Sequence, residues 1–202
     1  MIANKTFSLS VIIPAYNEER FIATTLNRVF NLPPAKEVII VNDGSTDDTG
    51  DIINKVAIEI RERPPRYLRN LEIINKPANE GKGVAIRSGL DLVKGDIVII
   101  QDADLELNPA EYPKLLKPFE TEGADIVFGS RFLIIQQQSD RSLTRYSRLG
   151  NRILTFFSNI FSGLHLTDME TGYKIFKTDI IKSFPLVSKG FNIFIWALNS
   201  TA

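Results

Sequence analysis

Residues 95–106 have the sequence GDIVIIQDADLE, in which a short apolar run is followed at once by three carboxylates. The apolar run is typical of a strand that is buried on both faces, and we predict this strand over Asp96–Gln101. Asp102, Asp104 and Glu106 follow it at alternate positions. Crowded carboxylates repel one another, so such a cluster often binds a cation, and oxygen ligands favour Mg²⁺ or Mn²⁺. A solvated acidic turn at a strand end is the alternative.

The composition fits one globular catalytic domain, which we expect over residues 1–202, because 44% of the 202 residues are hydrophobic. Equal numbers of basic and acidic residues, 24 of each, give no reason to expect a nucleic-acid partner. The chain has no cysteine and a single histidine, His165, which argues against disulfides, zinc sites and a histidine triad. Without a signal peptide or an apolar run of ~18 residues, we expect a cytoplasmic location, peripheral to the cytoplasmic face of a membrane.

Apolar strand patterns alternate with amphipathic helical patterns along the chain. The predicted strands are Leu9–Pro14, Glu37–Asn42, Leu71–Asn75, Asp96–Gln101 and Ala124–Gly129, and the predicted helices lie near Glu18–Phe30, Asp47–Ile60, Gly83–Val93 and Pro109–Glu120. This alternation predicts an α/β fold in which helices cover both faces of a mostly parallel sheet. Ligands of such sheets bind at the carboxyl ends of the strands.

Polar motifs follow the first two predicted strands at those ends. Tyr16 and Glu18 come after the first strand, and Asp43-Gly44-Ser45-Thr46 comes after the second. Asp43 can accept a hydrogen bond from a nucleobase or a ribose, and Tyr16 can stack on a base. A turn that begins the next helix explains the Asp43 motif equally well, and Tyr16 is equally compatible with a buried aromatic side chain.

Asn79-Glu80-Gly81-Lys82-Gly83 is predicted to open a helix. Its glycines allow the backbone to approach a ligand, a helix N-terminus favours anions, and Lys82 adds a charge suited to phosphate. A glycine-rich turn with a solvated lysine is the alternative. The motif is neither a P-loop nor a dinucleotide fingerprint, because it lacks the required Lys-Ser/Thr and Gly-x-Gly-x-x-Gly patterns.

Two features of the C-terminal third suggest contact with phosphate or membrane. Four arginines at helical spacing precede an aromatic-rich stretch over 153–161: they are Arg141, Arg145, Arg148 and Arg152. This pattern suits an anionic membrane or an isoprenoid phosphate, and an ordinary amphipathic helix equally. In the second feature, Asp168 can orient an acceptor and Lys174 can neutralise phosphate, ahead of a short strand at Ile175-Phe176; a surface turn is the alternative.

Taken in order, these motifs resemble family 2 glycosyltransferases of the GT-A fold, over about residues 8 to 190. The similar branch is that of the dolichyl- and polyprenyl-phosphate sugar synthases, which includes dolichyl-phosphate mannose synthase and polyprenyl-phosphate glucosyltransferases. The motifs that carry the resemblance are VIIPAYNEE, VNDGSTDDT, NEGKG, QDADLE, GSRF and DMETGYK.

The resemblance implies metal-dependent, inverting transfer of a hexose from UDP-glucose or GDP-mannose to a polyprenyl or dolichyl phosphate, with Mg²⁺ or Mn²⁺ as cofactor. It implies a nucleotide site that contains Pro14, Tyr16, Asn17, Glu18, Asp43, Lys82 and Asp102. The metal ligands would be Asp102, Asp104 and Glu106. The catalytic set would be Asp102, Asp104, Arg131, Arg145, Asp168 and Lys174, with Arg131 and Arg145 on the acceptor phosphate and Lys174 near the transferred phosphates.

The chain departs from the family after Gly190-Phe191, where apolar residues replace the usual acidic stretch. The C-terminal helices or membrane spans of many relatives are also missing. One interpretation is a chain truncated or altered at its end, with reduced activity or membrane attachment and weak membrane binding through 141–161. The alternatives are a family 2 glycosyltransferase with a soluble glycan, lipid or protein acceptor, and a catalytically impaired nucleotide-sugar-binding domain.

Overall fold

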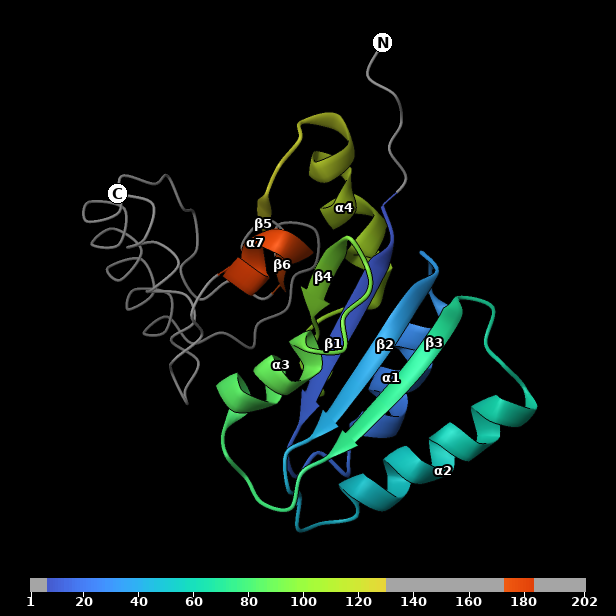
Figure 1. The fold of residues 1–202 in the computed structure, drawn as a ribbon. Helices are drawn as coiled ribbons and strands as arrows, with labels where there is room; N and C mark the ends of the chain where they lie inside the picture. The colour runs from blue at the N-terminus through green and yellow to red at the C-terminus, as the bar shows by residue number, and fades with distance from the viewer. Residues whose placement is uncertain (1–6, 130–172, 184–202) are drawn as a thin grey trace, which may run out of the picture.

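The computed structural model describes residues 7–129 and 173–183, which form a six-stranded sheet with helices on both faces (Figure 1). The strand order is β3-β2-β1-β4-β6-β5. The strands are β1 Leu9–Ala15, β2 Lys36–Asn42, β3 Leu68–Asn75, β4 Ile97–Ile100, β5 Ile126–Gly129 and β6 Tyr173–Lys177. The predicted α/β fold with a mostly parallel sheet is confirmed.

The parallel part of the sheet consists of β3, β2, β1 and β4. Ile13 lies opposite Ile40 of β2, and Ile12 lies opposite Ile100 of β4. Every residue of β1 and β2 is buried, as their apolar sequences predict for strands covered on both sides. The carboxyl ends of these strands therefore meet at one edge of the sheet, where the polar motifs follow them.

The last strand of the described chain, β6, inserts between β4 and β5 and runs antiparallel to both. The sequence predicts a strand at Ile175-Phe176, and the structure extends it and gives its place. Ile175 lies opposite Ile99 of β4 and Val127 of β5. Consequently β5, which follows α4 in the chain, is separated from the parallel strands by β6, a strand that comes later in the sequence than β5.

Helices cover the two faces of the sheet and bury separate apolar clusters. Figure 1 shows α3 in front of the sheet and α1 behind it. The helices are α1 Ile22–Asn31, α2 Thr49–Glu62, α3 Lys82–Leu90, α4 Tyr112–Thr121 with the short 3₁₀ turn η1 Pro109–Glu111 before it, and α7 Thr178–Ser183. Val11 packs in the cluster with α1, α2 and α4, whereas its neighbour Ile12 packs with α3 and α7. This alternation of β1 side chains explains why its apolar run is continuous.

The helix boundaries agree with the sequence predictions to within a few residues, with one informative exception. The first helix begins at Ile22 rather than Glu18, because residues 18–21 form a turn in which the Glu18 carbonyl accepts the N–H groups of Phe21 and Ile22. The turn directs Glu18 to the sheet edge. In the described ranges, no helix has the length and apolar character that a bilayer crossing requires.

Candidate active site

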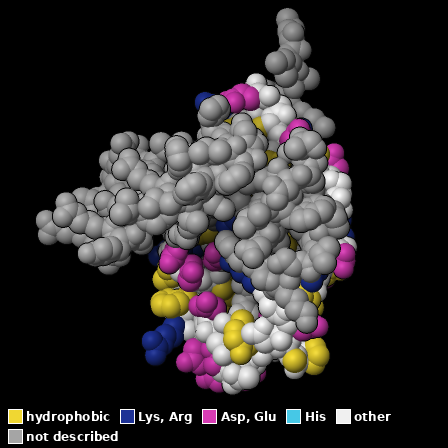
Figure 2. Space-filling view, turned by 90° about the vertical axis from the view of Figure 1, so that its left-hand side faces the viewer, with side chains coloured by type: hydrophobic (Ala, Val, Ile, Leu, Met, Phe, Trp, Pro, Cys, Tyr) yellow, Lys and Arg dark blue, Asp and Glu magenta, His cyan; other side chains and the backbone are white. Residues whose placement is uncertain are grey.

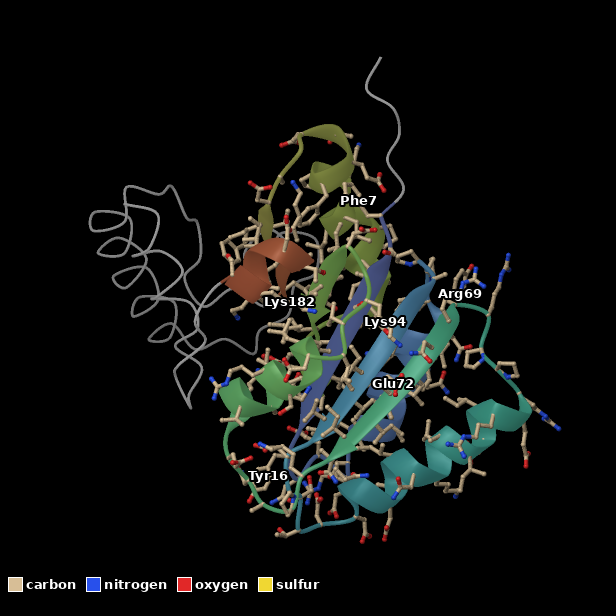
Figure 3. All side chains as sticks on the ribbon, in the orientation of Figure 1. Phe7, Tyr16, Arg69, Glu72, Lys94 and Lys182 are labelled. Atoms are coloured by element: carbon tan, nitrogen blue, oxygen red, sulfur yellow. The ribbon has the colours of Figure 1, made fainter. Side chains whose placement is uncertain are left out.

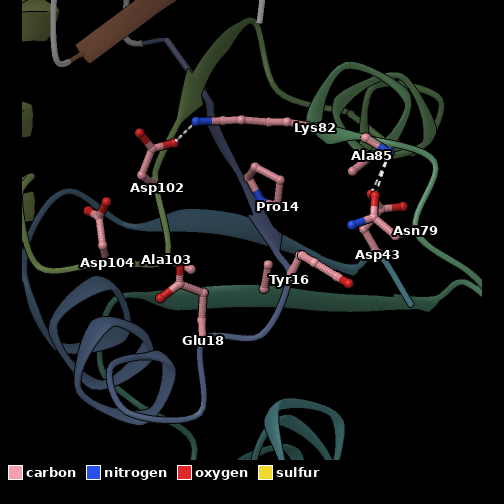
Figure 4. Close-up of a pocket in the computed structure, with 12 residues that line it drawn as sticks. Pro14, Tyr16, Glu18, Asp43, Asn79, Lys82, Ala85, Asp102, Ala103 and Asp104 are labelled. Carbon is pink, nitrogen blue, oxygen red and sulfur yellow. Dashed lines mark hydrogen bonds and ion pairs between the residues drawn. The ribbon is translucent and has the colours of Figure 1, made fainter. Parts of the chain in front are cut away.

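A pocket of about 270 Å³ lies at the carboxyl ends of β1, β2 and β4, beside the N-terminus of α3 (Figure 4). Segments far apart in the sequence contribute to it because parallel strands end at the same edge. The lining residues are Pro14, Ala15, Tyr16, Glu18, Asp43, Asn79, Gly81, Lys82, Ala85, Asp102, Ala103 and Asp104.

The loop after β1 forms one wall of the pocket and is attached to the loop after β2. Tyr16 lies at the lower end of the sheet in Figure 3 and is 43% exposed, so it is not a core residue. Asn17 has a positive φ of 55°, and its Oδ1 accepts the N–H of Thr46 at 2.8 Å. Its own N–H donates to Ser45 Oγ at 3.1 Å. Asn17 thus joins the two loops and is not among the lining residues.

Asp43 is the most buried carboxylate of the pocket, with 2% of its surface exposed. Its Oδ2 accepts the N–H of Gly81 at 2.9 Å, and its Oδ1 accepts the N–H of Glu80 at 3.3 Å. Lys76 Nζ lies 3.0 Å from Oδ1. A buried carboxylate requires such partners, and the loop between β3 and α3 supplies them at the pocket wall.

The side chain of Lys76 is only 8% exposed, and its Nζ lies 2.5 Å from Glu80 Oε2 as well as near Asp43. Burial lowers the pKa of Lys76, but hydrogen bonds and charge from Glu80 and Asp43 outweigh this effect, so its pKa is raised overall. The ammonium therefore stays charged.

Gly44 allows the same loop to approach Asp43. It has a φ of +67°, and a Cβ atom placed on it would lie 2.3 Å from the carbonyl carbon of Ala78. Only glycine leaves that space. The glycine of the Asp43-Gly44 motif therefore serves both as a turn residue and as a packing surface for the loop that binds Asp43.

Lys82 begins α3 and points across the pocket toward the acidic loop after β4 (Figure 4). Its Nζ forms an ion pair with Asp102 Oδ1, and both side chains remain partly exposed. The first turn of α3 also carries the partial positive charge of a helix N-terminus. A lysine and a helix N-terminus on one side, with carboxylates on the other, suit a ligand that carries phosphate together with a cation.

The acidic loop is held in place by buried hydrogen bonds. Gln101 Nε2 donates to the carbonyl of Asp102 at 3.0 Å, and Gln101 Oε1 accepts from the hydroxyls of Tyr112 and Tyr173 at 2.8 and 3.1 Å. From the other side, Thr25 Oγ1 donates to the carbonyl of Ala103 at 2.8 Å. Side chains from α4, β6 and α1 thereby fix the backbone from which Asp102 and Asp104 project.

Negative charge concentrates at the pocket. In Figure 2, several Asp and Glu side chains are visible on the lower part of the surface, where the carboxyl ends of the strands lie, and others are visible along its upper and right edges. Burial raises the pKa of Glu18, and the nearby charges of Asp104 and Asp102 raise it further. Among residues 7–129 and 173–183, no three acidic or histidine side chains stand close enough to hold a metal by themselves. Asp102 and Asp104 can supply oxygen ligands, and the remainder would have to come from ligand and water, as Mg²⁺ commonly accepts.

The structure brings most of the predicted nucleotide-site residues together and places others differently. Glu106 is exposed and does not line the pocket; Asp104 Oδ1 accepts its backbone N–H at 3.0 Å. Lys174 is a buried residue of β6, opposite Ile100 of β4, and is also not a lining residue. The predicted Arg131, Arg145 and Asp168 lie outside the described residues, as does the arginine stripe.

Sequence reasoning missed two residues that support the pocket without lining it, Lys76 and Gln101. Lys76 follows β3 with no motif around it, so only its proximity to Asp43 reveals its role. Gln101 carries a weak signal, because a polar side chain at the end of a fully apolar strand needs partners. The lining residues Asn79 and Gly81 belong to a motif that the sequence does indicate.

The sequence model of "Glycosyl transferase family 2" matches residues 10–184 of this chain. The chain belongs to glycosyl transferase family 2. The resemblance inferred from the motifs is thereby confirmed.

Two curated relatives of this family 2 chain are lipid-phosphate sugar transferases by name. The dolichyl-phosphate beta-glucosyltransferase ALG5A of Trichomonas vaginalis is 31% identical over 86% of this chain and 54% of its own length. The undecaprenyl-phosphate mannosyltransferase of Micrococcus luteus is 30% identical over 89% of this chain and 72% of its own length. The chain thus spans about half to three-quarters of these relatives.

Solved structures confirm the GT-A fold of the family. Glucosyl-3-phosphoglycerate synthase from Mycobacterium tuberculosis, in complex with Mn²⁺, UDP-glucose and phosphoglyceric acid, superposes with a TM-score of 0.70 and 25% identity. The match covers 96% of this chain and 65% of that protein.

Proposed function

We propose that this family 2 chain transfers a hexose from a nucleotide sugar to a polyprenyl or dolichyl phosphate, with inversion at the anomeric carbon. The observation that carries the proposal is the pocket at the sheet edge, which combines a buried carboxylate, a helix N-terminus with Lys82, and the Asp102–Asp104 loop. The names of the two curated relatives support a lipid phosphate as the acceptor.

The side chains that line the pocket match the chemical groups of a donor nucleotide. Tyr16, which is exposed at one end, offers a ring face for a nucleobase, and Asp43 offers a buried acceptor for a base or ribose donor. Lys82 and the first turn of α3 would bind the diphosphate. Asn17 would act by holding the loop that carries Tyr16 and Glu18, because it bonds to the loop after β2.

A divalent cation, Mg²⁺ or Mn²⁺, fits the donor atoms of the pocket. Asp102 and Asp104 are hard oxygen donors on one loop, and with Glu18 they leave an excess of negative charge that a cation would offset. When bound, the cation would neutralise charge on the diphosphate leaving group. Glu106 would contribute only after its side chain turns toward the pocket, so Asp104 is the stronger candidate ligand.

The acceptor phosphate is already anionic at neutral pH, so it needs positioning more than a strong base. Attack of its oxygen on the anomeric carbon breaks the bond from that carbon to the diphosphate, which leaves with the electron pair. The sugar configuration inverts, so an α-linked donor gives a β-linked product. We assign the positioning of the acceptor to Arg131, Arg145 and Asp168, with Lys174 near the transferred phosphates. Arg131, Asp168 and Lys174 belong to the GSRF and DMETGYK motifs, and Arg145 belongs to the arginine stripe.

We further propose that the enzyme works peripherally at the cytoplasmic face of a membrane, where its lipid acceptor lies. The arginine stripe over 141–152 and the aromatic residues after it support this placement by their chemistry. Co-sedimentation with anionic liposomes at low salt should show binding that decreases at high salt. If the protein stays in the supernatant at both low and high salt, the proposal of peripheral membrane binding is contradicted.

The test of function is transfer of radiolabelled sugar to an extractable lipid. The protein is incubated with labelled UDP-glucose or GDP-mannose, Mn²⁺ or Mg²⁺ and a polyprenyl phosphate, and the organic phase is counted. Label should enter the lipid phase, and EDTA should prevent this. Metal-dependent donor hydrolysis without lipid labelling would point to another acceptor, whereas donor binding without transfer or hydrolysis would point to a catalytically impaired nucleotide-sugar-binding domain. Proton NMR of the product tests inversion, since a retained α-linkage contradicts it.

A further inference from the structure

Lys82 pairs with one of the two carboxylates that suit a divalent cation. Its Nζ contacts Asp102 Oδ1 (Figure 4), and both side chains are partly exposed, so that a ligand in the pocket can reach the pair. An ammonium group in this position offsets the charge of Asp102 and repels any cation that approaches the same carboxylate. Lys82 and a divalent cation therefore compete for Asp102.

The two residues of this pair differ in their freedom to move. The backbone of Asp102 is held in place, because its carbonyl accepts a hydrogen bond from the buried side chain of Gln101 at 3.0 Å. Lys82 reaches Asp102 from the first residue of α3 through a flexible four-carbon stem. When the pair separates, the lysine is therefore the residue that moves further.

A diphosphate in the pocket offers Lys82 a second anionic partner. The helix α3 begins at Lys82, and this end of the helix lines the pocket with Gly81 and Ala85 as well. Both of these residues are small, so a phosphate can approach the helix N-terminus, where the helix dipole and Lys82 attract it together. A diphosphate bound there draws the ammonium group away from Asp102 and leaves that carboxylate to the cation.

We propose that Lys82 makes binding of the divalent cation depend on the donor. Lys82 pairs with Asp102 until the diphosphate of a nucleotide sugar binds it instead, so the cation and the nucleotide bind together. The inference rests on the proposed function, because it requires a donor diphosphate in this pocket. It gives Lys82 two opposite effects: the residue strengthens binding of the nucleotide and weakens binding of the cation alone.

Binding of Mn²⁺ to the full chain without nucleotide tests the proposal, with the electron paramagnetic resonance signal of free Mn²⁺ as the measurement. Lys82→Met removes the competing charge, so it should bind Mn²⁺ about 5- to 150-fold more tightly than the wild type, which is the usual range of coupling between two ligands. With saturating UDP or GDP, this difference should shrink, because the ammonium group of the wild type then lies on the diphosphate. An unchanged or lower affinity of Lys82→Met for Mn²⁺ alone overturns the inference.

Two further variants separate the ion pair from a general effect of charge. Lys82→Arg keeps a positive charge at the same position and should bind Mn²⁺ as the wild type does. Arg20→Met removes a positive charge from an exposed residue that lies two positions after Glu18 and does not line the pocket, and it should also leave Mn²⁺ binding unchanged. If Arg20→Met raises the affinity as much as Lys82→Met does, surface charge explains the effect and the inference is overturned.

The outcomes also separate the inference from the function on which it rests. If neither UDP nor GDP binds to the wild type in Mn²⁺, the proposed function fails and the inference fails with it. If a nucleotide binds and the loss of Lys82 weakens binding of Mn²⁺ and nucleotide alike, the function survives, and Lys82 has a merely structural role. If Lys82→Met proves unfolded by circular dichroism, Lys82→Gln, which also removes the charge, is measured in its place.

Discussion

Lys82 Nζ contacts Asp102 Oδ1 across the pocket, so the first residue of α3 is paired with the first residue of the acidic loop. The two residues come from different sides of the α3–β4 connection, and the pair forms because β4 ends beside the start of that helix. Both side chains are partly exposed, and such pairs contribute at most about 1 kcal/mol to stability. The pair therefore contributes little to stability. Its main effect is to place a positively charged and a negatively charged side chain next to each other in the pocket.

Lys82→Met should weaken binding of a nucleoside diphosphate while leaving the protein folded. Hydrogen bonds to charged groups contribute about 1.5–3 kcal/mol, so we expect a loss of roughly ten- to a hundredfold in affinity. Isothermal titration calorimetry measures the affinity, and the thermal midpoint measures the fold. Lys82→Arg retains the charge and should retain most of the affinity. Equal affinity for Lys82→Met and the wild type would show that Lys82 does not contact the phosphates.

Asp104→Ala should abolish sugar transfer, whereas Glu106→Ala should cause the smaller loss. Asp104 lines the pocket, but Glu106 is exposed outside it. Titration of the activity with Mn²⁺ is the measurement, because loss of a metal ligand raises the concentration of metal that is needed. The reverse ranking, with Glu106→Ala the more damaging, would place the metal further along the loop than we propose.

Gly44→Ala should weaken nucleotide binding, and Gly123→Ala provides a matched control. Both glycines have φ near +68°, at +67° and +69°, so alanine strains the backbone similarly at each, by about 1–2 kcal/mol. Only at Gly44 does the added Cβ meet another segment, at Ala78; nothing lies within 4 Å of it at Gly123. We expect both variants to lower the thermal midpoint and only Gly44→Ala to lower affinity for UDP. Equal affinities would mean that the Ala78 loop can shift without disturbing Asp43.

Tyr112→Phe should destabilise the protein by about 1 kcal/mol, since it removes one buried hydrogen bond and no apolar surface. Tyr112 is fully buried, and its hydroxyl donates to Gln101 Oε1 at 2.8 Å. Urea unfolding measures the change in free energy. Because Tyr173 still donates to the same oxygen, activity should fall less than in Gln101→Leu, which releases the acidic loop. Equal loss of activity in the two variants would argue against Gln101 as the residue that holds the loop.

The stability of the protein should rise between pH 8 and pH 10.5 because of Lys36. Its Nζ is buried against the end of α1, where it donates to the carbonyls of Val29 and Leu32 at 2.7 and 2.5 Å. Burial lowers the pKa of Lys36 to about 8. In this range the unfolded chain retains a proton that the folded chain has released, so the free energy of unfolding increases with pH, by up to about 1.4 kcal/mol per unit.

The measurement for Lys36 is urea unfolding at a series of pH values, compared between the wild type and Lys36→Met. The difference in the free energy of unfolding between the wild type and Lys36→Met should change across pH 8–10.5. The control is Lys94→Met, at a lysine whose side chain is 72% exposed. Its free energy of unfolding should depend on pH as that of the wild type does. A constant difference for Lys36→Met would show that the buried lysine titrates normally.

The parallel half of the fold was predictable because its signals are local. Each apolar run in β1, β2 and β4 is covered on both faces, and each is followed directly by the polar residues that reach the pocket. Since parallel strands end at one edge, the convergence of Asp43, Lys82 and Asp102 follows from the alternation of strands and helices alone.

What could not be predicted depends on contacts between distant segments. Nothing local indicates that Lys76 pairs with Asp43, or that Tyr112 and Tyr173 share an oxygen of Gln101. The place of β6 is equally hidden, because its apolar pattern indicates a strand and not its neighbours. Asn17 shows the same limit: the motif suggests contact with nucleotide, while its actual bonds join two loops.

The position of β6 also has a consequence for how the chain folds. Among the strands that the structure describes, β4 has an open edge and β5 has no hydrogen-bonded neighbour until Tyr173–Lys177 is available, although both strands precede β6 in the chain. Open edges are prone to pairing with other chains. During synthesis from the N-terminus, the sheet therefore cannot close until residue 177 has emerged, and this late long-range pairing should be the slow step of folding.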